Sequence, residues 1–265
     1  MTTAVDSRAD AARAATVTAA LPRGVTAGNR LRQVLHAIMQ GSRPMLVVYW
    51  IVMVVAFVIG GIVVQIVAGG TGHSMWDYGT QSPKYFSMAL GISLTPAYLN
   101  LVVAQGITRR MFSVASSIYL AGAAAATSLL WMLVYQAERV LYDWQGWTQA
   151  LENEHLFTST SQAGLVFAEF FLLIVSHEAA GWLLGITFYR FGFWRGVLLL
   201  PLSVLPAAAT EFLLVAQWLA APLSGLGYHR PPLAVAAPVV VVVTVLGLYA
   251  GCLVLRPLAL KPAKG

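Results

Sequence analysis

The stretch MLVVYWIVMVVAFVIGGIVVQIVA, residues 45–68, has the length of a membrane-spanning helix and contains no charged side chain. A transmembrane α-helix needs about 20 consecutive, mostly apolar residues to cross the hydrocarbon core of a bilayer. The rest of the sequence has the same character: of 265 residues, 58% are apolar and 10% are charged. Roughly 25% of the residues in an average soluble domain are charged. The composition therefore predicts a polytopic membrane protein.

Scanning the chain for apolar runs of about 20 residues gives further candidate spans. Six are expected, near residues 45–68, 84–104, 112–136, 164–188, 197–221 and 233–255. The alternation of apolar and polar residues that is typical of membrane β-barrels is absent, so the spans should be helices. Pro201 and Pro206 fall within the fifth span, where we expect them to break or kink the helix. The sequence thus predicts an all-α integral membrane protein with six transmembrane helices.

The basic residues divide unevenly between the two ends of these spans. Thirteen of the sixteen fall on one side, namely Arg8, Arg13, Arg23, Arg30, Arg32, Arg43, Arg109, Arg110, Arg190, Arg195, Arg256, Lys261 and Lys264. The other side keeps Lys84, Arg139 and Arg230 together with the acids Asp77, Glu138, Asp143, Glu152 and Glu154. Because loops rich in Lys and Arg stay in the cytoplasm, both termini are predicted to be cytoplasmic in a multi-pass protein of the cell membrane. Basic residues beside span ends also argue against a nucleic acid partner.

The segment before the first span divides into a tail and an amphipathic helix. Residues 1–28 are rich in Ala, Thr and Arg and lack the apolar core of a signal peptide, which favours a disordered cytoplasmic tail. Within 29–40, apolar residues recur with helical spacing at Leu31, Val34, Leu35, Ile38 and Met39. We expect this helix to lie on the membrane surface, with Gly41 to Pro44 turning the chain into the first span. Residues 29–256 then form one transmembrane domain, and 257–265 form a second cytoplasmic tail.

On the outer side, the longest connection runs from 137 to 163. We expect it to carry an apolar stripe that rests on the membrane lipids as an aromatic belt, in preference to lining a substrate vestibule. The stripe consists of Val140, Leu141, Trp144, Trp147 and Leu151. The later turn 222–232 is rich in Pro and Gly. It is expected either to stay at the outer surface or to dip back into the membrane.

Three carboxyl groups lie inside predicted spans: Glu169 and Glu178 in the fourth, and Glu211 in the fifth. His177, Glu178 and Glu211 should have similar depths and could meet if these spans pack together. Glu169 should lie nearer the outer surface and on the opposite side of its helix from Glu178. Since charges inside a membrane are costly, these residues are candidates for the polar lining of a transport path or for a proton relay. A hydrogen-bonded cluster that only fixes helix packing is the alternative.

Several common active-site patterns fail in this sequence. The run His177-Glu178-Ala-Ala-Gly181 lacks the second histidine of the zinc-protease pattern, so neither a metal site nor a catalytic centre is predicted. Gly181 and Gly185 have the spacing of a small-residue helix contact, which we interpret as intramolecular packing. Cys252 is the single cysteine, so no intramolecular disulfide is possible. No phosphate-binding loop of the Walker type occurs, so we expect no ATP site in this chain.

A short polar turn, Gln105-Gly-Ile-Thr-Arg-Arg-Met-Phe112, separates the second and third spans. The run AQGITRRMFSVA resembles the turn of bacterial ABC exporter permeases, in which Gly, a hydrophobic residue, Thr or Ser and two basic residues precede an aromatic one. After the fourth span, GITFYRFGFWRG is similar to the Tyr-Arg-Phe-Gly pattern of the same group. The surface helix before six spans and the cytoplasmic termini are also similar to this class.

The resemblance implies a membrane subunit without enzyme activity that works with a separately encoded ATPase. ATP and Mg²⁺ would bind to that partner, and a second permease copy, identical or similar, would complete the transporter. The residues implied to contact the ATPase are Gln105, Gly106, Thr108, Arg109, Arg110 and Phe112. Without the resemblance, Arg109 and Arg110 could equally set the topology and bind lipid phosphates. A proton-coupled secondary transporter or channel that uses the intramembrane Glu residues, and a membrane scaffold or sensor without transport, are the alternative functions.

Overall fold

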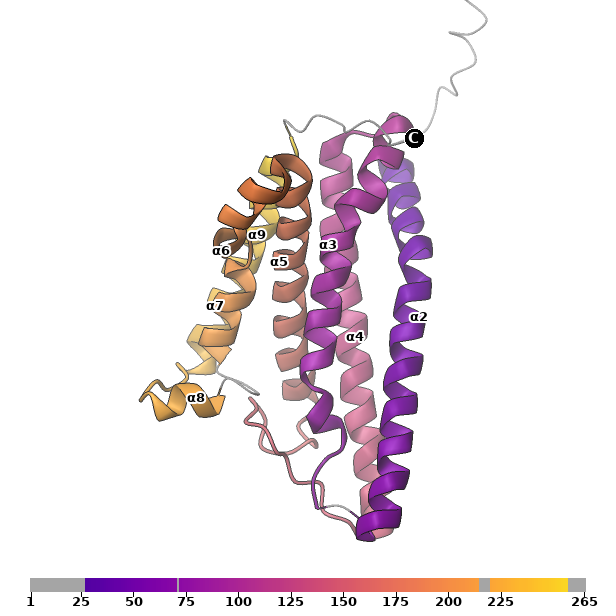
Figure 1. Ribbon diagram of the computed structural model, residues 1–265, viewed down its shortest axis with the longest axis vertical. Helices are drawn as coiled ribbons and strands as arrows, with labels where there is room; N and C mark the ends of the chain where they lie inside the picture. The colour runs from indigo at the N-terminus through magenta and orange to yellow at the C-terminus, as the bar shows by residue number, and fades with distance from the viewer. Residues whose placement is uncertain (1–26, 71, 215–219, 257–265) are drawn as a thin grey trace, which may run out of the picture.

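The computed structural model describes residues 27–70, 72–214 and 220–256, and within these ranges the chain is built of helices (Figure 1). The long helices are α2 (Ala27–Ala68), α3 (Gln81–Ala104), α4 (Arg109–Gln145), α5 (Ala163–Leu198) and α9 (Leu233–Leu255). The short ones are η1 (Trp76–Gly79), α6 (Leu200–Ser203), α7 (Leu205–Leu214) and α8 (Ala220–Gly225). The predicted all-α fold is confirmed for these residues. The predicted tails, apart from residues 27 and 28, lie outside them.

Five segments of the described chain are long and apolar enough to cross a membrane: α2, α4, α5, α9 and the stretch from η1 through α3. The prediction of a sixth continuous span at 197–221 is not confirmed. The chain there is divided among the end of α5, α6, α7 and the start of α8, with residues 215–219 outside the description. At ten residues, α7 is about 15 Å long, which is half the hydrocarbon thickness of a bilayer.

The breaks in this region have local causes. Gly192 has φ 76° and ψ −175°, a conformation that favours glycine, and it ends the regular part of α5. The separation of α6 from α7 falls at Val204, close to Pro206, whose ring nitrogen cannot donate to the carbonyl of Leu202. The prediction that Pro201 and Pro206 interrupt the helix is therefore confirmed. Figure 1 shows α7 running back alongside α5 after these breaks.

The predicted surface helix at 29–40 and the turn at Gly41 to Pro44 are wrong. α2 continues through Pro44 as one helix of 42 residues. Val34 and Ile38 are fully buried against α3 and α4, so most of the apolar stripe faces protein, whereas Met39 is exposed. Proline inside a helix costs about 3 kcal/mol, and burying two aliphatic side chains contributes roughly 3 to 6 kcal/mol. Tertiary packing thus outweighs the local helix-breaking residues.

Glycines bring α3 and α5 into backbone contact. A Cβ atom on Gly91 would lie 2.9 Å from the backbone nitrogen of Trp182, and one on Gly181 would lie 2.9 Å from the carbonyl carbon of Met88. A Cβ atom on Gly185 would lie 3.0 Å from the carbonyl carbon of Ile92. Contacts this short leave no room for a side chain. The two-glycine motif of α5 therefore mediates intramolecular packing, as predicted.

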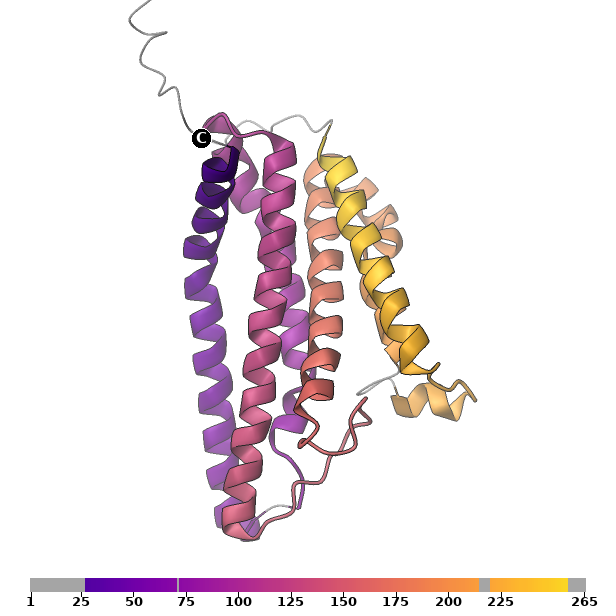
Figure 2. The same ribbon diagram turned by 180° about the vertical axis from the view of Figure 1, so that it is seen from behind.

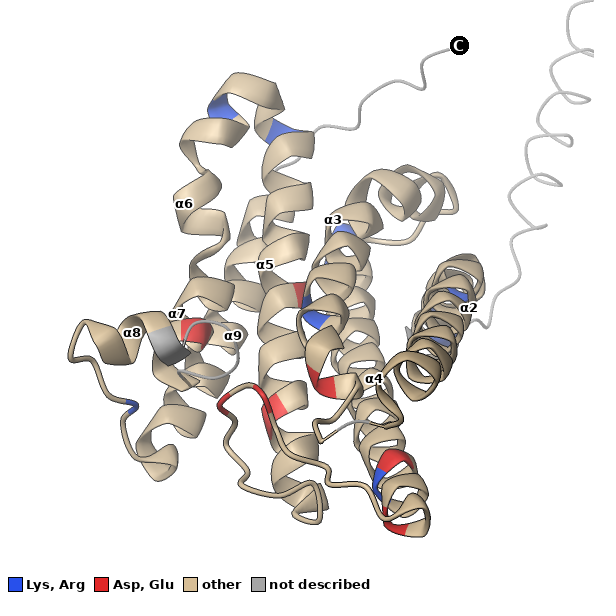
Figure 3. Ribbon diagram, turned by 60° about the horizontal axis from the view of Figure 1, so that its bottom comes forward, with Lys and Arg blue, Asp and Glu red and all other residues tan. Residues whose placement is uncertain are grey.

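The charged residues lie toward opposite ends of the bundle. Both ends of the described chain and the turn between α3 and α4 lie at the same end, in Figure 1 and in the reverse view of Figure 2. At that end Arg109 Nη1 donates to the carbonyl oxygen of Arg256 over 3.4 Å, and Arg190 Nη1 donates to that of Val254 over 2.7 Å. Figure 3 brings the other end forward and shows that many of the Asp and Glu positions, coloured red on the ribbon, lie toward it. The predicted grouping of charges is thus present in the fold.

The connection predicted at 137–163 is shorter than expected, because α4 continues to Gln145 and ends at Gly146 in a left-handed conformation. Val140 and Trp144 are exposed on the last turns of α4, as an aromatic belt requires. Trp147 instead packs over Gly70, and Leu151 packs against the buried cluster that contains Tyr135. The predicted stripe is therefore divided between the outside of α4 and the protein interior.

Candidate functional site

The turn between α3 and α4 is a compact structure with buried anchors. Gly106 has φ 75°, and the Thr108 side chain caps α4 by accepting a hydrogen bond from the backbone nitrogen of Met111 over 3.3 Å. Ile107 and Phe112 are buried in the core. Of the predicted turn residues, Phe112 thus faces inward and Arg109 is half-buried. Those with exposed side chains or backbone are Gln105, Gly106, Thr108 and Arg110.

A second candidate site lies inside the bundle, where α3, α5 and α7 meet. Lys84 and Glu211 form a buried ion pair, and His177 Nε2 lies 3.4 Å from the same carboxylate oxygen. His177 Nδ1 donates to the carbonyl oxygen of Leu173 over 2.7 Å. A neutral His177 therefore presents an unprotonated Nε2 to Glu211, and protonation would give this carboxylate a second positive partner. Nε2 of His177 is thus a position in this cluster that can accept one additional proton.

Lys84 was assigned to the outer surface by the charge distribution, but its side chain is fully buried. Burying a lone ammonium group costs several kcal/mol, which its ion pair with Glu211 offsets. The two residues are 127 positions apart in the chain. The only sequence signal for Lys84 was its position at the start of an apolar run, which does not identify a partner.

Glu178 lies apart from this cluster. Its carboxyl group is fully buried, and its polar contact among the described residues is with the side chain of Ser87, not with Lys84, His177 or Glu211. The prediction that His177, Glu178 and Glu211 could meet is therefore right for His177 and Glu211 and wrong for Glu178. Consecutive residues of a helix point about 100° apart, which turns Glu178 away from α7.

Glu169 belongs to a third group, on the side of the acidic loops. His155 bridges two buried carboxylates: its Nε2 lies 2.6 Å from Asp77 Oδ1 and its Nδ1 lies 2.7 Å from Glu169 Oε1. Asp77 also accepts hydrogen bonds from the backbone nitrogens of Glu152 and Asn153, over 2.6 and 2.8 Å. This triad of Asp77, His155 and Glu169 joins η1, the connection before α5 and α5 itself. The predicted separation of Glu169 from Glu178 is confirmed, whereas its partners were not predicted.

The electrostatics of the triad keep His155 charged. Burial by itself would lower the pKa of His155, but the attraction of Glu169 and the hydrogen bonds with Asp77 and Glu169 raise it to about 9. The imidazolium thus stays protonated at neutral pH between its two carboxylates. Arg230 Nη1 donates to the backbone oxygen of His155 over 3.1 Å, which also ties the segment before α9 to the triad.

The triad and the ion pair both lie along α5, which supplies Glu169 to the triad and His177 beside Glu211. Buried ionisable groups therefore extend from the loop before α5 to α7. Within the described residues, no group of three or more His, Cys, Asp and Glu side chains could hold a metal ion.

No family model, curated protein or solved structure matches this chain. Fold and composition therefore define its class. Its described residues form a helical bundle with five segments long and apolar enough to cross a membrane, and they bury ionisable groups between the helices.

Proposed function

We propose that the chain is the permease subunit of an ATP-driven ABC exporter, working with a separately encoded ATPase and a second permease copy. The observation that supports this most is the turn 105–108, whose exposed residues are held by buried neighbours. An exposed turn on rigid anchors suits a coupling surface, because a partner that pushes on it moves both attached helices. Arg110 offers a planar, permanently charged donor to acidic residues of such a partner.

A path for the motion follows from the packing. Ile107 and Phe112 belong to the same buried cluster as residues of α3 and α5. The glycine contacts between α3 and α5 are close enough to transmit small displacements, because packed interfaces transmit strain. In this proposal, closure of the ATPase pair shifts the turn and then moves α3 against α5. His177, Glu178 and Glu211, now joined by Lys84, are the proposed polar residues along the translocation path.

The coupling contact can be tested with charge reversals at one end of the bundle. The double variant Gln105→Glu, Arg110→Glu should lose co-purification with the ATPase while inserting normally. Arg195→Glu is the matched control, because Arg195 is also exposed on the basic side of the predicted topology but lies outside the turn. Undiminished co-purification of the double variant would refute the contact. Loss in both variants would point to a general effect of charge.

The cluster of Lys84, Glu211 and His177 favours a second candidate, a proton-coupled secondary transporter. Purified protein in proteoliposomes separates the two functions. Substrate movement driven by a pH gradient without any ATPase would favour the second candidate, and transport that requires ATP and the partner would favour the first.

A further inference from the structure

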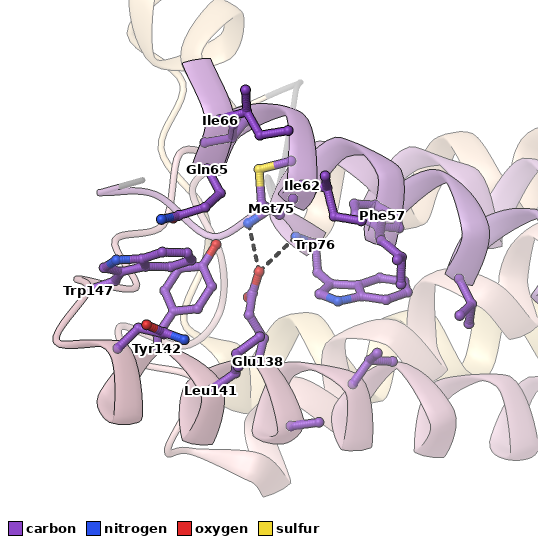
Figure 4. Close-up of a pocket in the computed structure, with 17 residues that line it drawn as sticks. Phe57, Ile62, Gln65, Ile66, Met75, Trp76, Glu138, Leu141, Tyr142 and Trp147 are labelled. Atoms are coloured by element: carbon purple, nitrogen blue, oxygen red, sulfur yellow. Dashed lines mark hydrogen bonds between the residues drawn. The ribbon is translucent and has the colours of Figure 1, made fainter. Parts of the chain in front are cut away.

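A cavity of about 500 Å³ lies between the second half of α2 and the end of α4 (Figure 4). Its walls come from Val54 to Ile66 of α2, from Met75 and Trp76, and from Val134 to Trp147. The volume falls within the range of small-molecule sites. Ile62 and Ile66 on one wall are exposed, so the cavity is open on the lipid-facing side of α2. The proposed path residues Lys84, His177, Glu178 and Glu211 do not line this cavity.

The cavity changes character along its length. α2 and α4 run in the same direction in Figure 1, so Val54 and Val134 lie at one end, with Gln65 and Gln145 at the other. Val54 and Gln65 are eleven positions apart in α2, and Val134 and Gln145 are eleven positions apart in α4. Eleven helical residues correspond to about 16 Å. That is roughly half the 30 Å hydrocarbon core of a bilayer. The cavity thus has an apolar inner end and a polar outer end, over the depth of one leaflet.

One carboxylate and several aromatic rings set the electrostatics of the cavity. Glu138 accepts hydrogen bonds from Ser74 Oγ (2.5 Å), Met75 N (2.7 Å), Trp76 N (3.2 Å) and Gln149 Nε2 (2.6 Å). These donors are all neutral groups, so no cationic side chain is bonded to this carboxylate. The residues that line the cavity include no Lys, Arg or His. The aromatic side chains are Phe57, Trp76, Tyr142 and Trp147.

We propose that this cavity binds a lipophilic cation that enters from the membrane. The apolar inner half receives the hydrocarbon or aromatic body of the ligand. The positive charge lies near Glu138 and over the aromatic faces, where cation–π attraction adds to the charge pairing. An anionic amphiphile finds no positive partner in the wall. Binding of the cation to this cavity requires only this chain, so the proposal does not depend on the proposed ATPase.

Radiolabelled tetraphenylphosphonium provides a direct test, with the full-length protein in lipid nanodiscs and empty nanodiscs as background. Gly61 lines the cavity, and a Cβ atom there would meet no atom within 4 Å, so Gly61→Phe places a ring in the open space. Gly122 is a matched control on α4, since a Cβ atom there also meets nothing within 4 Å and it does not line the cavity. We expect saturable binding to wild type and Gly122→Phe, and about tenfold or greater weakening in Gly61→Phe.

Glu138→Gln separates charge from shape. It should weaken binding of tetraphenylphosphonium about tenfold and leave binding of the neutral triphenylphosphine oxide unchanged. Equal loss of both compounds would show a collapsed cavity rather than a charge effect and would overturn the assignment of Glu138. Absence of saturable binding to wild type would overturn the whole proposal, whether lipid fills the cavity or a second copy of the chain covers it. Binding that Gly61→Phe leaves intact would overturn the location.

Discussion

Replacing His155 by Gln should remove a pH-dependent part of the stability of this protein. The pKa of His155 is raised from 6.5 to about 9 in the folded chain. A difference of about 2.5 pKa units corresponds to about 3 kcal/mol. Since the folded pKa is the higher one, this stabilisation is complete below pH 6.5 and is lost as the pH rises toward 9. The wild-type protein should therefore lose about 3 kcal/mol of unfolding free energy across that window.

Chemical unfolding in dodecyl maltoside micelles, followed by tryptophan fluorescence at several pH values, measures this effect. His155→Gln should be less stable than wild type at pH 6 and should show a much flatter profile from 6.5 to 9. His73→Gln is the control, because His73 is half-exposed and pairs with the equally exposed Glu152. It should keep the wild-type slope. An identical slope in wild type and His155→Gln would refute the account of the triad.

Three further substitutions test the packing. Lys84→Met leaves Glu211 without its partner and should cost about 3 to 5 kcal/mol in detergent unfolding, whereas adding Glu211→Leu should restore part of that loss. Gly181→Ala should lose about 1 to 3 kcal/mol of unfolding free energy, because its Cβ atom meets the backbone of α3. Gly164→Ala is the control, since a Cβ atom there meets nothing within 4 Å, and it should keep its stability. Equal effects of the two substitutions would contradict the glycine contact. Thr108→Ala should lose about 1 kcal/mol of stability with its capping bond, and Thr108→Ser should retain it; two equally stable variants would argue against the cap.

Features carried by local patterns could be predicted from the sequence. Apolar runs located the long helices, the prolines located the break before α7, and the glycine spacing identified a helix contact. Helical periodicity also separated Glu169 from Glu178, because residues nine positions apart fall on opposite sides of an α-helix. The grouping of basic residues followed from their positions at span ends.

Features that depend on distant partners could not be predicted. Lys84 and Asp77 were read as surface charges, since nothing near them in the sequence points to Glu211 or His155. The continuous α2 was missed for a related reason. Gly41 to Pro44 favour a turn locally, but the burial of Val34 and Ile38 against α3 and α4 favours one straight helix. Long-range packing decided each of these cases.

Affinity purification of the tagged chain from its native membranes, with mass spectrometry of the intact complex, tests the central claim most directly. The account predicts an ABC ATPase subunit in equal amount to the permease, and ATP hydrolysis by the purified complex. Recovery of the chain without any ATPase, from membranes in which it still moves its substrate along a proton gradient, would contradict it.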